Sequence, residues 1–184
     1  FTATSITLGD SKPSAAGNWR FVFTTATTIV GDTTENNSDM KIIMRFPLGG
    51  GTEPFVLPTG TSGMVNTDVV VAGLPTGGGL ITADGVDQPS DGGSAAPDAI
   101  MLTIDLTNGG SSATLSAGTV MTVDIINDKI TNPAKVAAAG TSDLYDISIE
   151  TLAGAGVVQD TGSSRVAIQD AQSVSASINT VLTF

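Results

Sequence analysis

Asn18-Trp-Arg-Phe-Val-Phe-Thr24 carries the clearest strand pattern in this chain. Its aromatic residues Trp19, Phe21 and Phe23 stand at every second position. Because successive side chains of a β-strand point to opposite faces, this spacing predicts a strand whose aromatic face is turned into a core. An exposed Trp19 would instead offer a stacking surface for a sugar, but its aromatic neighbours on the same face favour the core position.

The same alternation recurs along the chain and predicts a protein built from β-strands. Turn-forming Gly, Pro, Asn and Asp residues separate the alternating runs. Counting both ends, the sequence predicts about nine to ten strands, the clearest over residues 1–8, 19–24, 40–46, 65–72, 100–106, 121–125, 145–149, 165–168 and 174–184. We therefore predict an all-β fold, an antiparallel immunoglobulin-like or jelly-roll-like β-sandwich with no significant helix.

Composition excludes several classes of function. The 184 residues include no Cys and no His, which removes disulfides, a Cys nucleophile, a Ser-His-Asp triad and most zinc or iron sites. No acidic pair stands in an obvious catalytic motif, so we expect no enzyme. Eighteen acidic residues against seven basic ones give a net charge of −11, which disfavours nucleic acid as a partner. No apolar run is long enough to span a membrane as a helix, so no membrane insertion is expected.

Asp84, Asp87 and Asp91 form the candidate metal site, a calcium site on a Gly-rich segment. Calcium prefers several oxygen ligands, which carboxylates supply, although the spacing does not match an EF-hand loop. The alternative interpretation is an ordinary solvated loop, because residues 82–97 are the longest irregular stretch and are expected to run over the surface. No other cofactor is expected. A second, weaker acidic group consists of Asp124, Asp128, Asp143 and Asp146.

Three features predict a protein of the cell exterior. Asn36-Asn-Ser38 is an acceptable N-glycosylation sequon with Asn36 as the acceptor, in a polar segment over residues 31–39. The sparsely charged, Thr-rich composition is common in secreted surface proteins. The chain starts at Phe1 without a Met, which we interpret as a mature form after signal-peptide removal, with an excised fragment as the alternative.

Several stretches together resemble a module of secreted bacterial and archaeal surface proteins. They are Pro13-Ser-Ala-Ala-Gly-Asn-Trp-Arg-Phe-Val-Phe-Thr-Thr, Lys41-Ile-Ile-Met-Arg-Phe-Pro, Leu115-Ser-Ala-Gly-Thr-Val-Met-Thr-Val-Asp-Ile, Ile130-Thr-Asn-Pro-Ala and Tyr145-Asp-Ile-Ser-Ile-Glu-Thr. The resemblance is a loose consensus over most of the chain, and it departs from the family where residues 135–143 lengthen one connection. It implies an immunoglobulin-like sandwich with a structural or adhesive role and carries over no catalytic residue.

In architecture the chain also resembles subunits of extracellular filaments that assemble by strand donation. In such families a terminal strand completes the sheet of the next subunit, and the head-to-tail contact builds a fibre. We expect residues 1–10 to hold the donor strand, with Phe1, Ile6 and Leu8 as its apolar anchors. Residues 11–184 then form one sandwich domain, which residues 174–184 complete.

The expected function is therefore a structural subunit of a pilus-like filament or surface layer, with copies of the same chain as partners. The alternative is a monomeric adhesin or carbohydrate-binding module, whose partners would be surface glycans. The two differ in a property that is simple to measure, because only the first requires the chain to polymerise.

Overall fold

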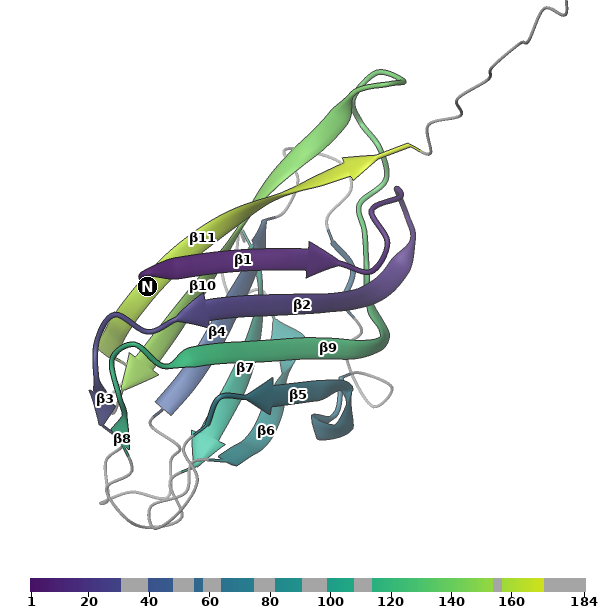
Figure 1. Ribbon diagram of the computed structural model, residues 1–184. Helices are drawn as coiled ribbons and strands as arrows, with labels where there is room; N and C mark the ends of the chain where they lie inside the picture. The colour runs from purple at the N-terminus through teal and green to yellow at the C-terminus, as the bar shows by residue number, and fades with distance from the viewer. Residues whose placement is uncertain are drawn as a thin grey trace, which may run out of the picture.

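The computed structural model describes residues 1–30, 40–47, 55–57, 64–74, 82–90, 99–107, 114–153 and 157–170. Two antiparallel sheets face each other as the layers of a sandwich, and the strands of the rear layer run obliquely across those of the front layer (Figure 1). This arrangement confirms the predicted all-β sandwich. No helix in the described ranges has the length and apolar character needed to cross a membrane.

The front sheet has the strand order β1-β2-β9-β5 and the rear sheet the order β11-β10-β4-β7-β6. The front strands are β1 (Ala3–Leu8), β2 (Ala16–Thr24), β9 (Val120–Thr131) and β5 (Val69–Ala72). The rear strands are β11 (Val157–Gln169), β10 (Ser142–Ala153), β4 (Met40–Pro47), β7 (Ala99–Thr107) and β6 (Thr82–Ser90). A small sheet pairs β3 (Ile29–Val30) with β8 (Thr114–Leu115), and a short 3-10 turn, η2 (Asn66–Asp68), precedes β5.

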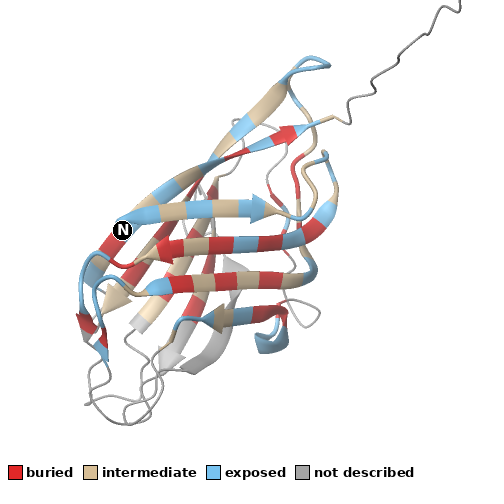
Figure 2. Cartoon of the chain, in the orientation of Figure 1, coloured by how far each residue is buried: buried red, intermediate tan, exposed pale blue. Residues whose placement is uncertain are grey.

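The core fills the space between the two sheets and is centred on aromatic rings. Buried and exposed residues alternate along β2 and β9, as their sequences predict (Figure 2). The Trp19 ring lies 5.8 Å from Phe46 and 5.5 Å from Phe55, both edge to face. Trp19 is only 1% exposed, so the predicted core position is confirmed and the ring is not available to stack on a sugar.

An irregularity in the pairing of β9 with β2 lies beside the η2 turn. Asn127 and Asp128 both have positive φ, 61° and 52°, a region that Asn and Asp tolerate better than other non-glycine residues. The Asn127 side chain donates a hydrogen bond to the Asp68 carboxylate at 2.8 Å, and the Asp128 nitrogen donates to the Asn18 side chain at 3.0 Å. Lys129 pairs with the same Asp68 at 3.1 Å. Asp68 thus links η2 to β9 from a buried position.

The rear sheet corrects two expectations. Residues 82–97 are not one surface loop, because Thr82–Ser90 forms the edge strand β6. Two register shifts against β7 accommodate the Gly, Asp and Pro residues that suggested a loop, and Pro is tolerated on an edge strand. The strand expected over residues 165–168 is instead the thirteen-residue β11, since its polar first half pairs with β10.

Candidate functional site

Phe1, Ile6 and Leu8, the predicted assembly residues, lie in or beside β1 within their own chain. β1 pairs with β2 in an antiparallel register that places Ile6 opposite Phe21 and Leu8 opposite Trp19. Phe1 precedes the strand, and its ring lies 4.7 Å from that of Phe23. All three side chains are partly buried and pack against the core. The first strand of the chain therefore completes the front sheet and forms its edge.

The free edge of β1 is defined by its hydrogen-bond register. The Gly9 nitrogen donates to the Asn18 carbonyl oxygen at 2.7 Å, which makes Gly9 and Asn18 a hydrogen-bonded pair. Because such pairs alternate along antiparallel strands, the backbone groups of Thr4, Ile6 and Leu8 point away from β2. Their N–H and C=O groups find no hydrogen-bond partner among the described residues.

The edge of β11 faces β1 and carries a second row of such groups. The Thr161 carbonyl and the Gln169 nitrogen both bond outside the β10–β11 ladder, which fixes the outward direction of the odd-numbered residues between them. Ser163, Arg165 and Ala167 therefore present their backbone groups towards β1, also without a described partner. We call the two facing edges the β1–β11 seam, defined by Thr4, Ile6, Leu8, Ser163, Arg165 and Ala167.

Two hydrogen bonds close the seam at its ends. The Phe1 nitrogen donates to the Thr161 carbonyl oxygen at 3.2 Å, and the Gln169 nitrogen donates to the Ser11 carbonyl oxygen at 3.0 Å. β1 and β11 therefore run in the same direction. They lie together near the N-terminus and diverge towards the end of β1 (Figure 1).

Gly162 allows the close approach at the first end of the seam. A Cβ at this position would lie 2.7 Å from both the Phe1 Cδ2 atom and the Thr4 Oγ1 atom, too close for any side chain without displacement. The absence of a side chain at Gly162 therefore lets β1 pack directly on β11.

Gly162→Ala is expected to loosen β1 and to lower the free energy of unfolding by about 1–2 kcal/mol, because Phe1 and Thr4 must shift. Hydrogen–deuterium exchange should become faster over residues 1–8 and remain unchanged in β9. Ser163→Ala, at an exposed position on the same strand, is the matched control and should leave both measurements unaltered. Equal exchange in the two variants would show that the Gly162 contact does not hold β1.

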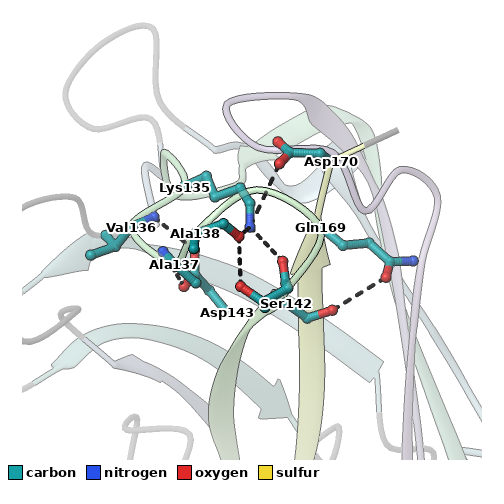
Figure 3. Close-up of polar contacts among 9 residues, drawn as sticks. Lys135, Val136, Ala137, Ala138, Ser142, Asp143, Gln169 and Asp170 are labelled. Atoms are coloured by element: carbon teal, nitrogen blue, oxygen red, sulfur yellow. Dashed lines mark hydrogen bonds and ion pairs between the residues drawn. The ribbon is translucent and has the colours of Figure 1, made fainter. Parts of the chain in front are cut away.

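The chain leaves β11 at a point fixed by a network on the β9–β10 connection (Figure 3). Lys135 Nζ donates to the carbonyl oxygens of Ala138 and Thr141 and lies 3.6 Å from the Asp170 carboxylate. The Lys135 side chain is only 11% exposed. The Asp143 carboxylate accepts the backbone N–H groups of residues 136 and 137, both at 2.8 Å, which shapes the loop around the lysine.

The same connection also holds the turn between β1 and β2. The Asn132 side-chain nitrogen donates to the carbonyl oxygens of Asp10 and Lys12, each at 2.9 Å, and the Ser14 nitrogen donates to Pro133 at 3.1 Å. These bonds fix the segment that would act as a hinge if β1 left its sheet. The sequence marked Asn132 only as part of an Asn-Pro turn signal, and it marked Lys135 only through the unusual length of the connection.

Charged groups on the outer face of the rear sheet are paired. Arg165 contacts Asp146 at 2.7 Å, and this hydrogen bond lowers the pKa of the Asp146 carboxyl and raises that of Arg165. On the front sheet Arg20 pairs with Asp124 at 2.6 Å. The second acidic group predicted from sequence is therefore wrong: Asp124 and Asp146 have separate basic partners, and the described residues contain no cluster of three potential metal ligands.

The first predicted acidic site remains a prediction. Asp84 and Asp87 stand on β6 and Asp91 lies outside the described residues. The glycosylation acceptor Asn36 and residues 174–184 also lie outside them. No known family model, curated protein or solved structure matches this chain.

Proposed function

We propose that this protein is a structural subunit of an extracellular filament or surface layer that polymerises head to tail by donation of a terminal β-strand. The observation that carries the proposal is the β1–β11 seam. Both edges of the sandwich on this side carry backbone groups without a described partner, and on β1 these groups stand beside partly buried apolar side chains, which is what an added strand requires.

The composition of β1 supports the proposal. Proteins protect exposed edges with Lys, Pro or short strands, because a free edge pairs with other chains. β1 reads Ala-Thr-Ser-Ile-Thr-Leu and carries neither Lys nor Pro. A contact between a strand of one copy and an edge of the next is heterologous, and its repetition builds an open fibre when the rotation between copies does not close a ring.

A monomeric adhesin or carbohydrate-binding module has less support. Trp19 is the single tryptophan and the residue best suited to stack on a sugar ring, but it is buried in the core. The large apolar side chains that are exposed among the described residues are aliphatic, mostly Val, and they lack the flat aromatic face on which sugars stack.

The full chain is expected to form polydisperse assemblies that sediment far faster than a single 18.4 kDa subunit, with fibres or sheets visible by electron microscopy. Backbone pairing and apolar burial in the seam drive this association, because each large side chain buried contributes roughly 1.5–3 kcal/mol. A single monodisperse 18.4 kDa species across a wide concentration range would rule the function out and favour the monomeric alternative.

A further inference from the structure

We propose that residues 174–184 of one copy insert as a β-strand into the β1–β11 seam of a second copy. The inference rests on the proposed strand-donation function and names both the donor segment and its acceptor. It reverses the roles that sequence alone suggested, in which residues 1–8 are donated and residues 174–184 remain in their own sandwich. Phe1, Ile6 and Leu8 then belong to the acceptor.

The side chains along the seam match the alternation of the donor segment. On β1, Ile6 and Leu8 face the core and stay half-buried, whereas Ser5 and Thr7 face solvent. A strand that pairs with the outward backbone groups of β1 has two faces. The side chains on one face lie beside Ile6 and Leu8 on the core side of the sheet, and those on the other face lie beside Ser5 and Thr7 on the solvent side. The donor's two faces follow from its alternation. The mainly apolar face consists of Val174, Ala176, Ile178, Thr180, Leu182 and Phe184, and the mainly polar face of Ser175, Ser177, Asn179, Val181 and Thr183.

Insertion also satisfies more backbone groups than it disrupts. The six seam residues each offer one N–H and one C=O, about twelve groups in all. The bonds that must open are the two at the ends of the seam, from Phe1 to Thr161 and from Gln169 to Ser11, and the close contact of Gly162 with Phe1 and Thr4 must part as well. Because β1 and β11 run in the same direction, an inserted strand can be antiparallel to both, which is the more favourable pairing.

The sequence after β11 favours a second copy over the chain's own seam. To enter its own seam, the chain would have to reverse direction between Asp170 and Val174. Residues 171–173 are Ala, Gln and Ser, and none is the Gly or Asn that supplies positive φ in tight hairpin turns. Lys135 also pairs with Asp170 at the end of β11 (Figure 3). A segment that continued from Asp170 in the direction of β11 would therefore extend away from the seam of its own copy.

The donor should also be the terminus that can leave without dismantling the domain. β1 is held by its ladder with β2, by the Phe1–Phe23 contact and by the bonds from Asn132 to the β1–β2 turn. At the other terminus, Asp170 is the last described residue, and its contact with Lys135 is the last one that holds the chain to the domain among the described residues. Donation of residues 174–184 therefore leaves every described strand of the sandwich in place.

Mixed cysteine variants of the full chain test the contact directly, because the chain has no native cysteine. Ser5→Cys would be made in unlabelled copies, and Ser177→Cys or Asn179→Cys in copies carrying a heavy isotope. After co-assembly and mild oxidation, mass spectrometry should find mixed-isotope disulfide dimers about tenfold more abundant than with Ala72→Cys, since a disulfide needs close Cβ atoms. Ala72 is the matched control, exposed on β5 at the opposite edge of the same sheet.

The outcomes separate the two proposals. A full chain that stays monomeric contradicts the proposed function and this inference with it. Assemblies that give no excess of the mixed dimer over the Ala72→Cys control contradict the inference alone. The same holds if chains carrying both Ser5→Cys and Asn179→Cys crosslink only within themselves, because the segment would then occupy its own seam.

A pair of charge substitutions on neighbouring residues supplies an independent readout. Ile178→Asp places a carboxylate on the face turned to the core and should lower the assembled fraction by about tenfold or more. Asn179→Asp adds the same charge to the solvent face and should stay within about twofold of the unsubstituted chain. Circular dichroism checks that both variants remain folded. Equal assembly of folded Ile178→Asp and Asn179→Asp chains would exclude residues 174–184 as the donor.

Discussion

Trp19→Ala is expected to lower the free energy of unfolding by about 3–5 kcal/mol, which is a large part of the stability of an ordinary domain. The indole contacts Phe21, Phe46 and Phe55 with ring centroids 5.5–6.0 Å apart, so its removal leaves a cavity that three rigid rings cannot fill. Because Trp19 is the only tryptophan, unfolding should be followed by far-ultraviolet circular dichroism in a denaturant series.

Trp19→Phe is the matched control and should cost less than about 2 kcal/mol. The indole Nε1 is buried and has no hydrogen-bond partner among the described residues. Phe loses some contact area but also removes this unpaired N–H, whose burial is itself unfavourable. If the Phe variant were as unstable as the Ala variant, the nitrogen would have a partner that stabilises the fold.

Asp68→Asn is expected to lower the free energy of unfolding by about 1–3 kcal/mol at neutral pH. The Asp68 carboxylate accepts hydrogen bonds from the Asn127 side chain and from the Val65 nitrogen, the latter at 2.9 Å, and it pairs with Lys129. These groups converge on a site that is nearly closed to solvent, where losing the charge leaves Lys129 without its counter-ion.

The effect of Asp68 should depend on pH with a definite sign. The Asn127 hydrogen bond, aided by the Val65 nitrogen and Lys129, lowers the pKa of Asp68 below its ordinary value even though burial acts in the opposite direction. A carboxyl whose pKa is lower in the folded state contributes its full stabilisation above the unfolded pKa, about 3.9, and loses it as the pH falls through the folded value.

Stability curves of the unsubstituted chain and the Asp68→Asn variant should therefore converge as the pH falls below about 4. Asp146→Asn is the control, because its pair with Arg165 is exposed to solvent and should contribute little at any pH. A constant difference between the two Asp68 curves down to strongly acidic pH would contradict the role assigned to the carboxylate.

Much of the sandwich could be predicted from local pattern, including the edge strands β1 and β5, but the two edge strands of the rear sheet could not. Alternation located the inner strands β2, β4, β7, β9 and β10, because a strand packed on a core must turn every second side chain inwards. The sequence pattern did not predict β6, and it predicted only residues 165–168 of β11. An edge strand has a neighbour on one side only, so bulges, Pro and polar residues that mimic loop sequences are tolerated there.

The candidate site is formed by the edges of β1 and β11, which lie side by side. No single position in the sequence indicates that these two strands are neighbours. Phe1, Ile6 and Leu8 were predicted as the apolar anchors of a donated strand, which stays a prediction. The residues that Phe1 contacts, Phe23, Thr161 and Gly162, are distant in sequence. Which backbone groups of β1 remain free depends on its register with β2. That register is fixed by packing on the core and by the Gly9–Asn18 bond.

The strand class, the aromatic core face around Trp19 and the absence of histidine and cysteine chemistry follow from the amino-acid sequence alone, because they depend on residue type and on a period of two. The side-by-side placement of β1 and β11, as edge strands of two different sheets, appears only in the folded chain. That juxtaposition depends on strand order and register, which arise from contacts between residues far apart in the chain and leave no local pattern to read.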